Sequence, residues 1–273
     1  MIANARMYSV TPEIGALWRD LLGAVIRRSG ADVDLVEHPA PQPIEPLWAR
    51  PDKAAVLMCG LPFSLAEATI PVAAPVPSPA AYGGRPVYWS ELVVRRDSPF
   101  HRLEDVLGGR LALTSPGSQS GCIAALTLFA GIDRPAPLFA EIVGPTVTPQ
   151  GSIQAVLDGR ADVAPIDGFA LGLLRHHAPE IAEGVRTIAH TATTPIPLFV
   201  ASPGSEAALA ETLLTAHDDA ELRDLMAAVL VERFVAVQAD DYRPLRETRR
   251  RSLAYWRDRP LAETIPPAFQ LAP

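Results

Sequence analysis

The side chains best suited to binding chemistry lie in one serine-rich turn. Residues 115–122 read S-P-G-S-Q-S-G-C, and apolar residues follow them at helical spacing. We predict that this helix begins between Ser118 and Ser120, where a serine hydroxyl can cap it. Unpaired N–H groups at a helix start, together with the positive end of the helix dipole, suit an anion, and Gly121 would let a ligand approach the backbone closely. The same residues also fit a serine-capped helix that binds nothing.

Further candidate residues directly follow predicted strands. Cys59 and Gly60 come after the apolar strand 54–58, and a glycine there indicates a tight turn at the sheet edge where α/β proteins bind ligands. Asp167 ends the apolar strand 161–166, so its carboxylate either contacts a ligand or caps the next helix. The sequence places no histidine or other base to activate Cys59, so a small buried thiol is the alternative to a nucleophile.

The elements that position these residues alternate between strands and helices. This alternation predicts an α/β fold with largely parallel sheets. Two extended segments, 87–95 and 191–197, are interpreted as crossover strands between two lobes, with a ligand cleft between the lobes. The expected lobes are residues 1–89 together with 194–273, and residues 90–193.

Local signals predict the bounds of several elements. Residues 5–10 predict a first strand, and Thr11 followed by Pro12 predicts the cap and first position of the next helix. Ser152 is predicted to cap a later helix. The chain after residue 201 is predicted to be mostly helical.

Composition limits the classes of function. The 273 residues carry a net charge of −7, which gives no electrostatic footprint for nucleic acid. No apolar run reaches the roughly 20 residues that a membrane helix needs, so we expect no membrane insertion. The two cysteines form no zinc pattern or disulfide framework, and we assign no cofactor or metal. The first ten residues do not read as an export signal, so we expect a cytoplasmic protein as printed and a periplasmic one if a signal has been processed away.

Seven short motifs, in order along most of the chain, resemble one known family. They are M-Y (Met7, Tyr8), C-G-L-P (59–62), S-E-L-V-V-R (90–95), L-E-D-V-L-G-G-R (103–110), S-P-G-S-Q-S-G (115–121), G-R-A-D-V-A-P-I-D (159–167) and D-Y-R-P-L (241–245). Each motif alone is weak, but together they resemble the phosphate/phosphonate-type substrate-binding proteins of ABC transporters, which have the type 2 periplasmic-binding fold. One departure is Pro149, which stands where relatives often have a histidine.

The resemblance implies a binding module that closes two lobes over a small anionic or zwitterionic ligand. An ABC transporter permease is the implied protein partner, and we expect a monomer. The serine turn would bind the ligand's anionic oxygens, while Tyr8 either stacks on the ligand or packs in the core and Tyr242 either reaches the cleft or closes its lobe. The residues expected to bind ligand are Tyr8, Cys59, Gly60, Ser90, Ser115, Ser118, Gln119, Ser120, Gly121, Cys122, Asp167 and Tyr242.

Two other classes of function remain open. The same fold carries lyases and enzymes that synthesise cofactor precursors, and in an enzyme Cys59 and Asp167 would be the first catalytic candidates. A cytosolic ligand sensor is the third interpretation, although no DNA-binding helix-turn-helix is attached. Turnover separates an enzyme from a binding protein, because a binding protein returns its ligand unchanged.

Overall fold

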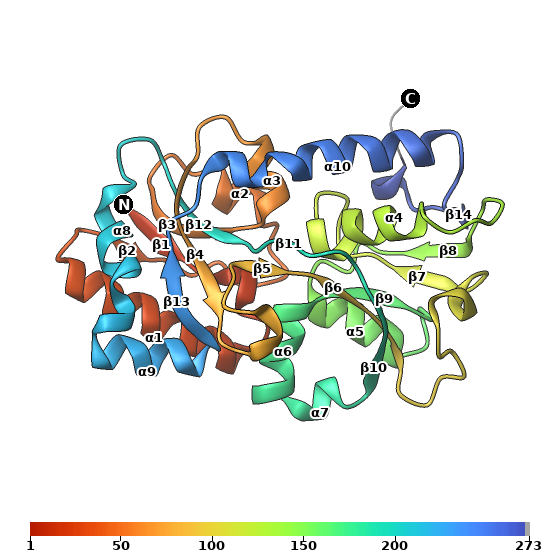
Figure 1. The fold of residues 1–273 in the computed structure, drawn as a ribbon, viewed down its shortest axis with the longest axis horizontal. Coiled ribbons are helices and arrows are strands. Elements are labelled where there is room, and N and C mark those ends of the chain that lie inside the picture. Colours follow the sequence, from red (N-terminus) through yellow and green to blue (C-terminus); the bar gives the residue numbers. More distant parts are fainter. Residues whose placement is uncertain (271–273) are drawn as a thin grey trace. The chain divides into compact units, whose positions relative to one another are not determined.

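The computed structural model describes residues 1–270, and the chain divides into two compact units. Unit 1 comprises Met1–Tyr88 and Pro195–Arg243, and unit 2 comprises Trp89–Thr194 and the chain from Pro244 onward (Figure 1). No helix within residues 1–270 is long and apolar enough to cross a membrane.

The C-terminal segment differs from the expected division, which placed residues 194–273 in one lobe. Residues 244–270 pack with unit 2. Their strand β14 (Ala262–Thr264) pairs with β8 (Phe139–Val143), and the indole N–H of Trp256 donates to the Leu126 carbonyl. These contacts join residues more than 100 positions apart, so no local sequence signal indicates them.

Unit 1 is built on a sheet with strand order β13-β4-β12-β3-β1-β2. The strand bounds are β1 (Ile2–Asn4), β2 (Asp34–Leu35), β3 (Lys53–Met58), β4 (Ile70–Pro77), β5 (Val87–Tyr88), β12 (Leu198–Ala201) and β13 (Val231–Val235). The helices are η1 (Arg6–Tyr8), α1 (Pro12–Ser29), α2 (Glu45–Trp48), α3 (Gly60–Leu65), η2 (Ala80–Tyr82), α8 (Ala207–Leu214), η5 (Ala216–Asp218), α9 (Ala220–Ala228) and the start of α10 (Ala239–Arg257). In Figure 1, α1 and α9 run side by side, and ion pairs from Arg28 to Asp219 and Glu221 join them.

Unit 2 contains two three-stranded sheets, β10-β6-β9 and β14-β8-β7. The remaining strand bounds are β6 (Ser90–Arg95), β7 (Arg110–Ala112), β9 (Ala164–Asp167), β10 (Val185–His190) and β11 (Thr194–Pro195). The helices are η3 (Leu103–Val106), η4 (Gln119–Ile123), α4 (Ala124–Phe129), α5 (Pro149–Leu157), α6 (Gly168–His177), α7 (Pro179–Ala182), η6 (Pro267–Phe269) and the rest of α10.

The predicted α/β class is confirmed, but the sheets are mixed rather than largely parallel. Strand β1 pairs in parallel with β2 and β3, whereas β12 and β13 run antiparallel to their neighbours. Strand β13 (V-E-R-F-V) lies in the region that the sequence predicts to be mostly helical. Its two buried residues, Val231 and Phe234, are three positions apart, and the register with β4 shifts between Val231 and Arg233, so the burial does not alternate strictly.

Local signals set two element ends near the N-terminus. Thr11 caps α1 by accepting from the Ile14 amide, as predicted, and Pro12 occupies the first turn. The predicted strand over 5–10 is wrong. Strand β1 stops at Asn4 because the Asn4 side chain accepts from the Arg6 amide, and the backbone then turns into η1.

Candidate functional site

The serine turn is the start of a helix, as predicted. Ser118 is the N-cap of the π-helical turn η4, and its hydroxyl accepts from the Gly121 amide at 2.9 Å. The turn continues directly into α4. Within residues 1–270, the amides of Gln119 and Ser120 have no acceptor. This first turn therefore offers donors with no protein partner, at the positive end of the helix dipole.

Gly121 is required by packing inside unit 2. A Cβ atom at this position would lie 2.1 Å from Oγ1 and 2.6 Å from Cβ of Thr114. The Thr114 amide also donates to the Gly121 carbonyl at 3.0 Å. Thr114, two residues after β7, is thus the neighbour that leaves no room for a side chain at position 121. This contact holds the serine turn against the segment that follows β7.

Ser90 fixes the serine turn from the adjacent sheet. Its hydroxyl donates to the Ser120 carbonyl at 2.8 Å, and its amide donates to the Thr191 hydroxyl at 2.9 Å. Ser90 also lies opposite Asp167 in the antiparallel pair of β6 and β9. The structure therefore brings together three predicted site residues, Ser90, Ser120 and Asp167, from separate parts of the sequence.

Asp167 caps a helix, which is one of its two predicted roles. It is 4% exposed, and its Oδ1 accepts from the amides of Phe169 and Ala170 at 2.9 and 3.0 Å. These amides belong to the first turn of α6. The carboxylate thus stabilises the start of α6 by capping and by its charge at the helix N-terminus.

Gln119 places an unsatisfied polar group in the serine turn. The residue is 1% exposed, and its Oε1 is buried with no hydrogen-bond partner in the described part of the chain. Buried side-chain polar atoms are normally hydrogen-bonded, so we expect this atom to have a partner that the described residues do not supply. Half a turn about the last side-chain bond puts Nε2 in the same place, so the residue can meet either an acceptor or a donor.

The hydroxyl groups of Thr146 and Ser152 are linked to Thr114, which packs on Gly121 of the serine turn. Ser152, predicted as a helix cap, instead lies inside α5, fully buried and hydrogen-bonded to the Thr146 hydroxyl. Thr148 is the cap, and Pro149 follows it at the first helical position. This Thr-Pro pair repeats the pattern of Thr11 and Pro12 at α1, so the sequence did contain the signal. Sequence reasoning also missed Thr114, whose hydroxyl lies 3.4 Å from that of Ser152.

Four predicted site residues belong to unit 1. Tyr8 is fully buried and stacks on Trp18 with ring centroids 6.2 Å apart, which is its packing role. Cys59 is buried and directly precedes α3, where Gly60 is the first residue. Since β1 and β3 are parallel neighbours, Tyr8 and Cys59 follow strands that end at the same edge of the sheet.

Tyr242, the fourth of these residues, closes unit 1. Its hydroxyl donates to the Ile196 carbonyl at 2.9 Å, and its ring packs edge-on against Phe63. Burial, reinforced by Asp241, raises the pKa of Tyr242 well above its usual range.

Two predicted site residues contribute less directly to the serine turn. Ser115 lies before the turn, and its carbonyl accepts from the Ser118 amide at 3.1 Å. Cys122 is buried, and its thiol lies against an apolar pocket lined partly by α10. Burial raises the pKa of Cys122 to about 12, so the group is a neutral thiol at physiological pH. Within residues 1–270, no group of three or more His, Cys, Asp or Glu side chains is arranged to hold a metal ion.

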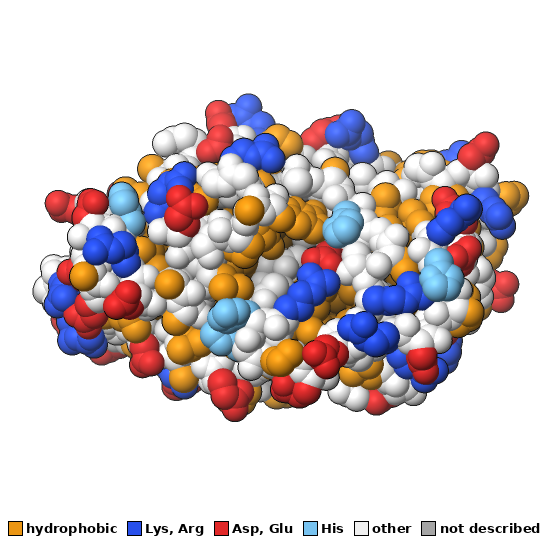
Figure 2. Space-filling model, turned by 60° about the horizontal axis from the view of Figure 1, so that its bottom comes forward, with side chains coloured by type: hydrophobic (Ala, Val, Ile, Leu, Met, Phe, Trp, Pro, Cys, Tyr) orange, Lys and Arg blue, Asp and Glu red, His pale blue; other side chains and the backbone are white. Residues whose placement is uncertain are grey.

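Arginines also gather on the exposed face around α7 and β10 of unit 2 (Figure 2). Arg175 pairs with both carboxylate oxygens of Glu91, at 2.9 and 2.8 Å. Arg186 donates to the Ser98 carbonyl, and Arg96 to that of Glu183. These guanidinium groups hold the fold of unit 2 together, so the serine turn remains the better candidate for binding an anion.

The comparisons with known proteins agree with this fold. A family model described as "ABC transporter, phosphonate, periplasmic substrate-binding protein" matches residues 55–242, which is more than half of the chain. No curated protein sequence matches.

Similar solved structures include binding proteins of phosphonate transporters. A binding-protein component of an ABC phosphonate transporter (PA3383) from Pseudomonas aeruginosa is 20% identical with a TM-score of 0.77, covering 93% of this chain and 88% of that one. PhnD1 from Prochlorococcus marinus, in complex with methylphosphonate, is 14% identical with a TM-score of 0.72, covering 92% and 96%. XAC2383 from Xanthomonas citri, bound to ATP, is 19% identical with a TM-score of 0.61, covering 95% and 98%. Identities this low demonstrate a shared fold and not a shared ligand.

Proposed function

Because the chain belongs to the periplasmic phosphonate-binding protein family of ABC transporters, we propose that it binds a small phosphonate-type oxyanion at the first turn of η4. The family is periplasmic and its members are the substrate-binding components of transporters. The proposal for this chain concerns the ligand class, the residues that bind it, and an ABC transporter permease as the partner that receives it.

Within residues 1–270 the amides of Gln119 and Ser120 have no acceptor, and this observation carries the proposal. Helix N-termini bind phosphate-like groups through such amides, because the N–H dipoles and the helix dipole point the same way. An oxyanion would receive charge-assisted hydrogen bonds there, which are about twice as strong as neutral ones. The buried side-chain amide of Gln119 supplies one further group that lacks a partner.

Preorganisation of the turn supports the same assignment. The Ser120 carbonyl is held by the Ser90 hydroxyl, the Gly121 amide by the Ser118 hydroxyl, and Gly121 itself packs on Thr114. A turn fixed on three sides loses little conformational freedom when it binds a ligand, so more of the interaction energy appears as affinity. No arginine or lysine is needed in this arrangement, because the donors are backbone amides.

An enzymatic role is less well supported by the same residues. Of the two first catalytic candidates, Cys59 is buried, and Asp167 uses one carboxylate oxygen to accept two helix amides. The other cysteine, Cys122, is a buried neutral thiol. A nucleophile needs an activated thiolate, and a raised pKa acts against that. We therefore assign the binding function first and keep turnover of a phosphonate as the result that would favour an enzyme.

The experiment compares Ser118→Asp with Ser118→Asn. Asp, Asn and Ser are about equally good N-caps, so both variants should fold with similar stability. Only Asp adds a negative charge beside the proposed oxyanion, and like charges at close range disfavour binding. Calorimetric titration with methylphosphonate should show wild type and Ser118→Asn binding, and Ser118→Asp at least about tenfold weaker, or 1.4 kcal/mol.

Two results would contradict the proposal in separate ways. Equal affinity of Ser118→Asp and Ser118→Asn would exclude the serine turn as the anion site. Absence of any methylphosphonate or phosphate binding by the wild-type protein would exclude the ligand class. Release of a chemically altered phosphonate during the titration would support the enzyme alternative.

A further inference from the structure

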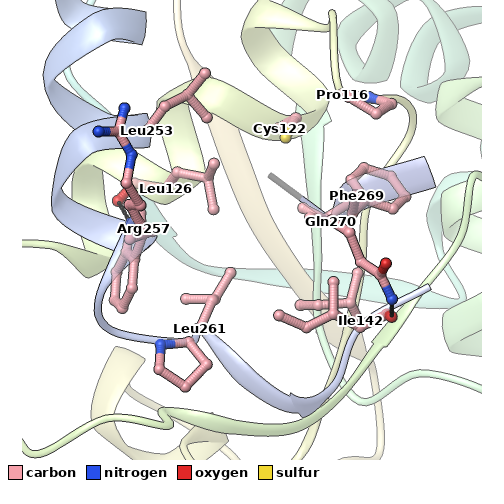
Figure 3. Close-up of a pocket in the computed structure, with 13 residues that line it drawn as sticks. Pro116, Cys122, Leu126, Ile142, Leu253, Arg257, Leu261, Phe269 and Gln270 are labelled. Atoms are coloured by element: carbon pink, nitrogen blue, oxygen red, sulfur yellow. Dashed lines mark hydrogen bonds between the residues drawn. The ribbon is translucent and has the colours of Figure 1, made fainter. Parts of the chain in front are cut away.

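Unit 2 contains a second concave site, an apolar pocket of about 370 Å³ (Figure 3). Its walls come from η4 and α4, from β8, from the last turns of α10, and from the segment that follows α10. Figure 3 shows the side chains of Leu126, Leu261, Ile142 and Phe269 around one space, with Cys122 at its upper edge. The volume lies within the range of small-molecule binding sites.

Most of the lining is hydrocarbon. The indole N–H of Trp256 is already used, because it donates to the Leu126 carbonyl at 3.0 Å, so the ring offers its carbon surface. The side chain of Gln270 donates to the Ile265 carbonyl at 3.3 Å. A ligand in this space would gain mainly from burial of an apolar body.

Arg257 is the charged residue of the lining. Within residues 1–270 its guanidinium group makes no hydrogen bond and no ion pair. Other arginines near the end of the chain have partners: Arg250 and Arg251 pair with Glu247, and Arg259 lies over the ring of Tyr255. In Figure 3 the guanidinium group of Arg257 lies at the rim, beside Leu253. Exposed side chains change rotamer within nanoseconds, so this group can follow a ligand at the mouth of the pocket.

From this arrangement we propose that the pocket binds a small monocarboxylate with an apolar body, of the class of medium-chain fatty acids. The chain occupies the apolar space, and the carboxylate remains at the rim with Arg257. A phosphonate does not fit these walls, because burying a doubly charged group against hydrocarbon without partners is costly. The apolar pocket therefore takes a different class of ligand from the η4 amides, and neither proposal depends on the other.

Cys122 provides a reporter inside the pocket wall. The only other cysteine of the chain, Cys59, lies in unit 1 and is an internal control. An occupied pocket should slow alkylation of Cys122 by a small maleimide and leave the rate at Cys59 unchanged. The two rates are measured together by mass spectrometry of the full chain.

The binding test uses octanoate and octanol, which share an apolar chain and differ in the head group. Calorimetric titration should show octanoate binding more tightly than octanol. Arg257→Gln should weaken octanoate binding by about two- to fivefold, the range for an exposed ion pair, and should leave octanol unchanged. Arg259→Gln is the matched control, because it removes an arginine two residues away that does not line the pocket.

A filling variant tests the location. Leu253→Trp adds a large side chain from the half-exposed side of α10 and should abolish binding of octanoate, whereas Ala254→Trp, on the exposed side, should not. The proposal is overturned if octanoate protects both cysteines equally or neither. It is also overturned if Arg257→Gln and Arg259→Gln bind octanoate with the same affinity as wild type, and this test holds even if Leu253→Trp fails to fold.

Discussion

Replacing Gly121 by alanine should destabilise unit 2, because the serine turn lies in direct contact with Thr114. The new Cβ would stand 2.6 Å from Thr114 Cβ, and ordinary contacts begin at 3.4 Å, so the two segments must separate by about 0.8 Å, the difference of those distances. Thr114 Cβ is attached to the backbone and cannot rotate away. The 3.0 Å hydrogen bond from the Thr114 amide to the Gly121 carbonyl would then exceed hydrogen-bonding distance.

The cost has two parts. Overpacking in a well-packed interior typically costs about 1–3 kcal/mol, and loss of one hydrogen bond adds about 0.5–1.5 kcal/mol. We expect the free energy of unfolding to fall by about 2–4 kcal/mol, which corresponds to a fall of roughly 5–15 °C in Tm. Binding of methylphosphonate should weaken as well, because the η4 amides move with the turn.

Gly117→Ala is the matched control in the same turn. No atom lies within 4 Å of the position that its Cβ would take, so its effect on stability should stay within about 0.5 kcal/mol. Thermal and urea unfolding, followed by circular dichroism, compare the two variants. Thr114→Gly combined with Gly121→Ala should recover part of the loss, because both clashing atoms are removed. Equal stability of Gly121→Ala and Gly117→Ala would refute the reasoning.

Three further predictions follow from the contacts of unit 2. Asp167→Ala should lower the free energy of unfolding by about 0.5–2 kcal/mol by removing the α6 cap, whereas Asp167→Ser keeps a capping side chain and should retain most of the stability. Weaker methylphosphonate binding by a fully stable Asp167→Ser variant would show that the carboxylate also contacts the ligand. Burial acts to raise the pKa of Glu91, but hydrogen bonds from Arg175 and Thr187 outweigh it and lower that pKa. The ionised Glu91 side chain therefore stabilises the folded protein at any pH above its unfolded-state pKa, and this stabilisation is lost as the pH falls through the lower folded-state pKa. The free energy of unfolding of Arg175→Met should therefore be lower than that of the wild type by about 1–3 kcal/mol at pH 7 and by progressively less below about pH 4. Urea unfolding at several pH values would measure this difference. Cys122 in the native protein should react with iodoacetamide at pH 8 far more slowly than a free thiol, though at a measurable rate, because its raised pKa leaves little thiolate; alkylation at the rate of a free thiol would contradict this.

The sequence predicts best those helix starts that are set by neighbouring residues. The caps at Thr11 and Ser118 follow from a hydroxyl placed before an apolar helical pattern, and both are present. The prediction of Ser152 as a cap is wrong because the Thr148-Pro149 pair just before it is the stronger signal. The α/β class follows from the alternation of elements, which does not depend on the exact bounds.

Contacts between distant residues are the part that the sequence does not reveal. The parallel pairing of β14 with β8, and of Ala262 with Phe139 in particular, places the chain after Pro244 in unit 2. The contact of Gly121 with Thr114 shows a packing role for a glycine whose position in the motif indicates only a place for ligand approach. In each case the partner lies in another element, so neither periodicity nor composition can identify it.

Amide resonances measured by NMR test the central claim most directly. The claim is that an oxyanion binds the amides of Gln119 and Ser120. On titration of the isotopically labelled protein with methylphosphonate, these two resonances should show the largest shifts, and that of Gly117 should move less. Saturable binding that leaves the two resonances unchanged, while amides elsewhere shift, would contradict the account.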